Sequence, residues 1–160
     1  MNKQFLQSKI IQVLEEAQQA ATKAALQAHA TATNKESVAE NKYDTFGLEA
    51  SYLAHGQAKR VAEYEEALLA YKSLGVISFN ADSAIALGSL VQLEDEEGMT
   101  QCLFLGPSAG GLKFDFEDKE ITLITTSSPL GEALIGRCAG DEVEMKLAGK
   151  NRFYEVVAIY

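Results

Sequence analysis

The sequence predicts an α+β protein: an N-terminal antiparallel α-helical coiled-coil hairpin followed by a small antiparallel β-sheet domain with one short helix. Residues 1–75 are rich in alanine, contain no proline and repeat their apolar positions at helical spacing. Residues 76–160 hold both prolines and most of the glycines, and their apolar residues alternate with polar ones. This change of composition near Gly75 predicts two domains, 1–75 and 76–160.

The first domain is expected to pair two helical arms, residues 2–32 and 48–74. Apolar stripes with spacings of three and four mark the contact between the arms. Their members are Leu6, Ile10, Val13, Ala17, Ala20 and Ala24, then Ala54, Ala58, Val61, Tyr64, Leu68 and Tyr71, with Phe5, Ile11 and Leu14 extending the packing. The polar stretch 33–47 is expected to form an acidic tip, where Thr33-x-x-Glu36 fits a capping box and Asn34 is the alternative N-cap.

The second domain is expected to be a sheet wrapped on the short helix. Period-two alternation over 112–117, 142–147 and 153–159 predicts half-buried strands. Glycine-containing hairpin turns are expected at 94–98 and 148–151. Ser128 and Pro129 suit the N-cap and first turn of the helix, which Gly136 would end.

Composition and charge exclude several classes of protein. An apolar fraction of 47% in 160 residues is typical of a globular chain, so wholesale disorder is excluded. The net charge is −9, and residues 76–160 carry 14 acidic against 6 basic groups, so DNA binding by the free protein is not expected. No apolar run is long enough for a membrane span, and two cysteines favour a reduced, cytoplasmic setting.

Carboxylates gather near the predicted tip. Glu36, Glu40 and Asp44 are spaced four apart, and Glu49 follows five residues later. Carboxylates on an extended arm can supply oxygen ligands to a Mg²⁺ held mainly by another molecule. The alternative is a solvated acidic loop with neighbouring lysines as counter-charges.

The segment ITLITTSSPLGEALIGRCAGDEV, residues 121–143, resembles the bacterial Gre transcript-cleavage factors (GreA/GreB). In that family a strand ending in Ser-Pro-Leu/Ile-Gly precedes Ala-Leu-Leu/Ile-Gly and then Gly-Asp-x-Val. ALGSLV at 86–91 is similar to the family's entry into this domain, and RFYEVVAI at 152–159 to its closing strand. The resemblance covers residues 76–160 and implies an FKBP-like domain after an N-terminal coiled coil.

The resemblance implies a transcription elongation factor that is not itself an enzyme. Its globular domain would dock at the rim of the secondary channel of bacterial RNA polymerase. The coiled coil would pass down the channel to the 3′ end of the nascent RNA, where two tip acids complete a second Mg²⁺ site for hydrolysis of backtracked RNA. The Mg²⁺ would be held mainly by the polymerase, and the free protein is expected to bind none.

Asp44 and Glu49 are the expected catalytic and metal-binding pair, with Glu40 as the next candidate. In the family the two tip acids are three residues apart, whereas Asp44 and Glu49 are five apart. A second reading therefore stays open, in which the protein binds the secondary channel and regulates transcription without stimulating cleavage. A prolyl isomerase, suggested by the FKBP-like fold alone, and an unrelated coiled-coil adaptor are weaker alternatives.

Two further sets of residues are candidates for contacts in the complex. The family's loop that contacts the polymerase rim is matched by Ser127, Ser128, Pro129 and Leu130. The alternative for this loop is a helix cap with a buried anchor. Lys59 and Arg60 on the second arm are expected near RNA phosphates, and the alternative for them is a solvated helix face.

Overall fold

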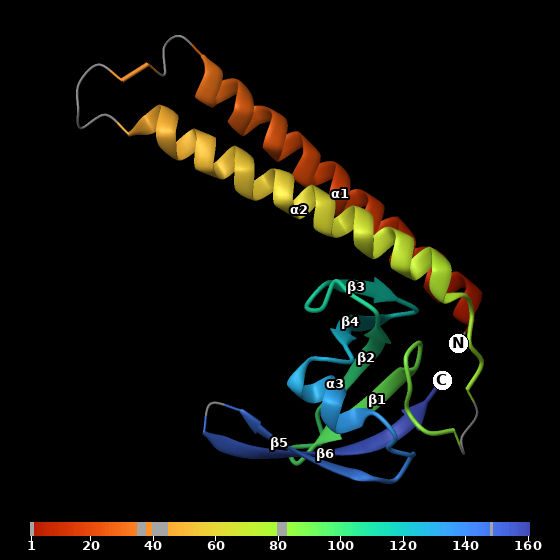
Figure 1. Cartoon of the computed structure of the whole chain (residues 1–160). Helices are drawn as coiled ribbons and strands as arrows, with labels where there is room; N and C mark the ends of the chain where they lie inside the picture. Colours follow the sequence, from red (N-terminus) through yellow and green to blue (C-terminus); the bar gives the residue numbers. More distant parts are fainter. Residues whose placement is uncertain (1, 35–37, 40–44, 80–82, 148) are drawn as a thin grey trace. The chain divides into compact units, whose positions relative to one another are not determined.

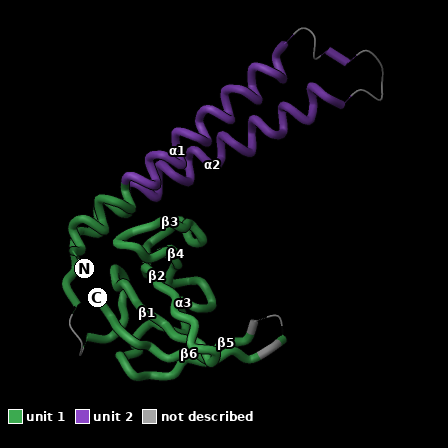
Figure 2. The backbone as a smooth tube through the Cα atoms, turned by 180° about the vertical axis from the view of Figure 1, so that it is seen from behind, with its two compact units in different colours: residues 1–11, 70–160 green, residues 12–69 purple. Residues whose placement is uncertain are grey.

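A computed structural model describes residues 2–34, 38–39, 45–79, 83–147 and 149–160 (Figure 1). The elements are α1 (Lys3–Thr33), α2 (Phe46–Leu74), β1 (Leu90–Asp95), β2 (Thr100–Gly106), β3 (Lys113–Phe116), β4 (Lys119–Thr125), α3 (Pro129–Leu134), β5 (Glu142–Leu147) and β6 (Lys150–Ile159). They form two compact units, residues 1–11 with 70–160 and residues 12–69 (Figure 2). The unit with the sheet therefore includes the start of α1 and the end of α2, although both precede the composition change near Gly75.

The two helical arms are confirmed, and their seam follows a seven-residue repeat. In residues 12–69 the least exposed positions of α1 are Leu14, Ala21 and Ala28. On α2 the buried or half-buried positions are Gly47, Ala50, Ala54, Gln57, Val61, Tyr64, Ala67 and Leu68, and all of them except Ala67 follow this repeat. Across this pair of helices the Gln18 side-chain amide donates a hydrogen bond of 3.2 Å to the Glu65 carboxylate.

Three positions of the predicted stripes are wrong. Ala20 and Ala58 are exposed, and the seam runs through Ala21 and Gln57 instead. Because alanines occupy neighbouring positions, they fit the seven-residue repeat in two alignments that differ by one residue. The sequence pattern predicted one alignment, and the structure adopts the other. Phe5 is also exposed, at 67%, although it was expected between the arms.

The predicted N-cap at Thr33 is wrong as well. Thr33 is the last residue of α1, and its hydroxyl donates to the His29 carbonyl oxygen at 2.9 Å. A threonine hydroxyl can bond back to the preceding helical turn, so the same residue type that caps a helix start can close a helix end. Glu36 lies outside the described residues.

The sheet has six strands in the order β3-β4-β2-β1-β6-β5. Four neighbouring pairs are antiparallel, but β2 and β4 are parallel, with Cys102 opposite Ile121 and Phe104 opposite Leu123. The predicted antiparallel sheet is thus confirmed for the sheet as a whole, with one parallel pair that the sequence did not predict. The reason is that β3 pairs with β4 alone at the sheet edge, so β4 returns beside β2 in the same direction.

One face of the sheet packs against α3. Branched aliphatic side chains from four strands and α3 form this core, including Leu93, Leu105, Leu134 and Val156 at 0% exposure. On the opposite face, the cross-strand partners Leu90 and Phe104 are buried, and the ring of Tyr71 lies 6.2 Å from that of Phe104. This second face is therefore covered around Phe104 by a side chain of the same unit.

The predicted turns and short helix are confirmed. In the turn after β1, Gly98 has φ +77°, and the Asp95 carboxylate accepts the N–H groups of Glu97 and Met99. α3 begins with Pro129 after the N-cap Ser128, and Gly136 at φ +79° follows its end. Among the described residues, neither long helix is apolar enough to cross a membrane.

Candidate functional site

At the tip of the hairpin, Glu49 lies in the first turn of α2 and is exposed. The Thr45 hydroxyl donates to Glu49 Oε1 at 2.7 Å, and the Glu49 N–H donates to the Thr45 carbonyl at 2.8 Å. A carboxylate at this end of a helix also interacts favourably with the helix dipole. Glu49 therefore has a local role at the start of α2, while its second carboxylate oxygen accepts no hydrogen bond from a described residue.

The other two predicted tip acids, Asp44 and Glu40, lie outside the described residues. Within the described ranges, no three His, Cys, Asp or Glu residues come together as a metal site. Mg²⁺ prefers several oxygen ligands in octahedral geometry, more than the one unengaged oxygen of Glu49 provides. Glu49 therefore forms no Mg²⁺ site by itself with the other described residues.

Lys59 and Arg60 are both exposed on α2. The Lys59 ammonium lies 3.9 Å from the Glu63 carboxylate, one helical turn away, in a pair whose side chains are 74% and 60% exposed. Such pairs contribute little to stability. Arg60 makes no ion pair with a described residue, so its guanidinium is available to an external anion.

The loop at 127–130 divides into two structural roles. The Ser128 hydroxyl donates to the Thr125 carbonyl at 2.8 Å and accepts the Gly131 N–H at 3.1 Å, and Leu130 packs against the core. Ser127 and Pro129 are exposed. Because Ser128 caps α3 and Leu130 packs against the core, Ser127 and Pro129 are the accessible part of the loop.

Gly131 explains why this loop needs a glycine. A Cβ at this position would overlap the Thr125 carbonyl oxygen, the same atom that accepts the Ser128 hydroxyl. The close approach of α3 to the end of β4 therefore requires the absence of a side chain. The Ser-Pro-Leu-Gly sequence is accordingly a folding motif as well as a candidate contact.

The apolar stripe predicted Tyr71 at the contact between the arms. It did not indicate that Tyr71 also lies beside the sheet. Its side chain is fully buried, and its hydroxyl donates to the Ser108 carbonyl at 3.0 Å. Burial raises the pKa of this phenol far above its ordinary value. A Cβ at Gly106 would overlap the Tyr71 hydroxyl, so the glycine admits the ring. Nothing in the sequence links residues 71 and 106.

Comparison with known proteins identifies the C-terminal part of the chain. Residues 80–160 match the family described as Transcription elongation factor, GreA/GreB, C-term. Transcription elongation factor GreA of Thioalkalivibrio sulfidiphilus is 31% identical over 100 residues, which are 62% of this chain and 60% of that protein. GreA of Syntrophus aciditrophicus is 30% identical over 125 residues, 77% of this chain and 71% of that protein.

Among solved structures, the GreA factor homolog 1 of Thermus thermophilus aligns with 96% of this chain and 92% of its own, at 22% identity and a TM-score of 0.40. The structure and the matched family together give a helical hairpin followed by a GreA/GreB C-terminal domain. The chain belongs to the GreA/GreB family of transcription elongation factors. The first of these relatives is matched over about 60% of its length.

Proposed function

We propose that this protein binds RNA polymerase through its C-terminal domain and stimulates cleavage of backtracked RNA through the acids of its hairpin tip. The observation that carries the proposal is the match of residues 80–160 to the GreA/GreB C-terminal domain. In this proposal the hairpin reaches the RNA 3′ end through the secondary channel, and the polymerase remains the catalyst.

The tip residues would act by charge and position. Glu49 presents a carboxylate oxygen that no described residue occupies, and its other oxygen is held by the Thr45 hydroxyl. With Asp44 or Glu40 it would hold Mg²⁺ together with polymerase ligands, and that ion would supply an activated water for phosphodiester hydrolysis. Lys59 and Arg60 on α2 would contact RNA phosphates by charge attraction.

The test is RNA cleavage in a stalled, backtracked elongation complex. Addition of the protein should speed release of short 3′ RNA fragments, and Asp44→Ala or Glu49→Ala should reduce this rate at least about tenfold. Glu49→Gln separates charge from capping, because the amide oxygen still accepts the Thr45 hydroxyl proton but carries no charge. Equal loss in Glu49→Gln and Glu49→Ala supports a metal-binding role.

Glu66→Ala is the matched control, since Glu66 is an exposed acid on the same helix outside the tip. It should keep the wild-type cleavage rate. All variants should bind polymerase with unchanged affinity, which a competition assay checks. A wild-type protein that binds but leaves the cleavage rate unchanged would contradict the proposal.

The hydrogen bond between Thr45 and Glu49 favours a second function, which is regulation of the polymerase without cleavage. The bond from the Thr45 hydroxyl uses one oxygen of the only predicted tip acid that the structure describes. Together with the five-residue spacing of Asp44 and Glu49, this suits a hairpin that occupies the channel and alters initiation or elongation. Inhibition of RNA synthesis that persists in Glu49→Gln would support this second function.

A further inference from the structure

Tyr71 of α2 connects three parts of the unit that contains the sheet (Figure 2). Its hydroxyl donates to the Ser108 carbonyl oxygen, in the loop between β2 and β3, at 3.0 Å. Its own carbonyl oxygen accepts the side-chain amide of Gln7 on α1 at 3.1 Å. Its ring is fully buried and lies 6.2 Å from that of Phe104 on β2. These contacts together are called the Tyr71 anchor below.

The sheet accommodates the Tyr71 anchor because residue 106 is a glycine. A Cβ at Gly106 would overlap the Tyr71 hydroxyl and lie 2.7 Å from Cζ of the ring. The backbone at Gly106 does not have the positive φ that favours glycine. The close approach of the Tyr71 ring is therefore the reason for a glycine at this position.

The loop that receives the Tyr71 hydroxyl carries two local costs. Ala109, the residue after the acceptor, has φ +56°, which is unfavourable for a residue with a side chain. The Ser108 hydroxyl is buried and makes no hydrogen bond with a described residue. Such costs persist where the surrounding structure fixes them, and they gather at functional positions. The shape of this loop thus points to a role for the anchor beyond core packing.

The Tyr71 anchor lies near the end of a helix that belongs to both compact units. α2 runs from Phe46 to Leu74 without a break, and the boundary between the units falls between Leu69 and Ala70. Tyr71 is the second residue of α2 on the sheet's side of this boundary. Because a helix is a stiff element, a restraint on its last turn also limits how the rest of the helix can move.

We propose that Tyr71 is a positioning residue for the tip of the hairpin. This inference rests on the proposed function, in which Glu49 and the neighbouring acids act while residues 80–160 are bound to RNA polymerase. The anchor restricts rotation of α2 about its last turn, so Glu49 meets the RNA 3′ end in one geometry. A misplacement that begins far from the reacting atoms can lower a rate by about a hundredfold. Loss of the anchor therefore lowers the cleavage rate without weakening polymerase binding.

The test measures RNA cleavage in a stalled, backtracked elongation complex over a range of protein concentrations, which gives a maximal rate and a half-saturating concentration. Tyr71→Phe keeps the ring and removes one hydrogen bond, so it should lower the maximal rate about threefold. Gly106→Ala displaces the ring and should lower it at least about tenfold. In both variants the half-saturating concentration should stay within about twofold of the wild type, since the 127–130 loop is unchanged.

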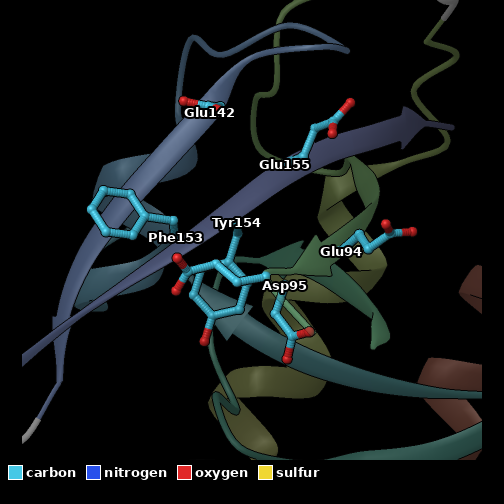
Figure 3. A pocket seen from close by; sticks show the side chains of 7 residues that line it. Glu94, Asp95, Glu142, Phe153, Tyr154 and Glu155 are labelled. Carbon is cyan, nitrogen blue, oxygen red and sulfur yellow. The ribbon is translucent and has the colours of Figure 1, made fainter. Parts of the chain in front are cut away.

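Two control variants change similar groups outside the anchor. Tyr64→Phe removes a hydroxyl from a half-buried position of the same helix. Glu155→Gln changes an exposed side chain of the sheet, on β6, where it lines the shallow hollow shown in Figure 3. Both controls should keep the maximal rate and the half-saturating concentration of the wild type.

The double variant Gly106→Ala/Tyr71→Leu separates positioning from stability. Leucine at position 71 removes the ring that overlaps the new Cβ, so the double variant should melt at a higher temperature than Gly106→Ala. Its maximal cleavage rate should stay as low as that of Gly106→Ala, because the hydroxyl and the ring are still missing.

Three results would overturn the positioning role. They are a wild-type maximal rate in Tyr71→Phe, recovery of the cleavage rate together with the melting temperature in the double variant, and a loss of activity that saturating protein restores. A wild-type protein that does not accelerate cleavage would instead contradict the proposed function, and this inference with it.

Discussion

The sheet unit and the helical unit of residues 12–69 are held together by different kinds of side chain. The core of the sheet consists of large aliphatic residues such as Leu93, Leu105 and Val156, all at 0% exposure. The buried side chains of α1 after Leu14 are the alanines Ala21 and Ala28. Hydrophobic stabilisation scales with buried apolar area, so each seam alanine contributes far less than a core leucine.

The outer half of the hairpin also keeps its large apolar side chains on the surface. Those described residues that are at least 56% exposed are Leu26, Val38, Phe46, Leu48, Tyr52 and Leu53. A hollow of about 460 Å³ borders both helices, and its lining includes the small residues Ala24, Ala28 and Ala50 beside the larger Phe46 and Leu53. The outer half of the hairpin is therefore stabilised by helix propensity and by small buried side chains, whereas the sheet unit is stabilised by a filled core.

The largest expected difference is between one core and one seam substitution. Leu93→Ala should destabilise the sheet unit by about 3 kcal/mol, because it leaves a cavity in a filled core. Ala21→Gly should cost about 1 kcal/mol, mainly through lost helix propensity. Hydrogen exchange measured by mass spectrometry reports the two units separately. Equal losses of stability in the two units would contradict the difference between a filled core and an alanine seam.

A smaller effect is expected from filling the hollow that borders both helices. Ala28→Leu should stabilise residues 12–69 by about 1 kcal/mol, since a larger apolar side chain can occupy the hollow it borders. Slower hydrogen exchange in α1 and α2 would show this gain. Ala20→Leu is the control at an exposed position and should change exchange little. A destabilised Ala28→Leu variant would mean that the seam is already filled.

The smallest effect concerns pH and belongs to the sheet unit. The Lys3 ammonium donates to the Ile77 carbonyl at 2.6 Å and lies 4.0 Å from the centre of the Phe79 ring. Burial lowers the pKa of Lys3 from 10.5 to about 8. Between these values the unfolded chain binds the proton and the folded chain does not, so stability rises with pH across this window.

Lys3→Met removes this dependence. The melting temperature of the wild type should therefore rise relative to that of Lys3→Met when the pH increases from 7 to 9.5. Lys9→Met is the control, because Lys9 is another lysine of the same helix, α1. Parallel pH profiles for the wild type and Lys3→Met would contradict the lowered pKa.

Much of the fold follows from local patterns in the chain. The helical spacing predicted both arms to within two residues, and Ser128, Pro129 and Gly136 marked the short helix where it is found. These features depend on backbone preferences and on capping within a few residues. Of the predicted tip acids, Glu49 is placed in the first turn of α2, and Asp44 and Glu40 are not described.

Other features required contacts between distant residues. The phase of the alanine seam, which runs through Ala21 and not Ala20, depends on how two helices meet. The parallel pairing of β2 with β4 depends on where β3 lies. The Tyr71 anchor joins a side chain of α2 to a loop 37 residues away in the chain, and no local pattern encodes that contact.

The sequence by itself determined a helical hairpin, an α+β C-terminal domain and membership of the GreA/GreB family, since helical spacing, strand alternation and the SSPLGEALIG and GDEV segments are local in the chain. The tertiary structure alone decided which alanines meet, that Tyr71 enters beside Gly106, and that its hydroxyl reaches the Ser108 carbonyl oxygen. The physical reason is that packing and register join residues far apart in the chain, and local preferences do not encode such distances.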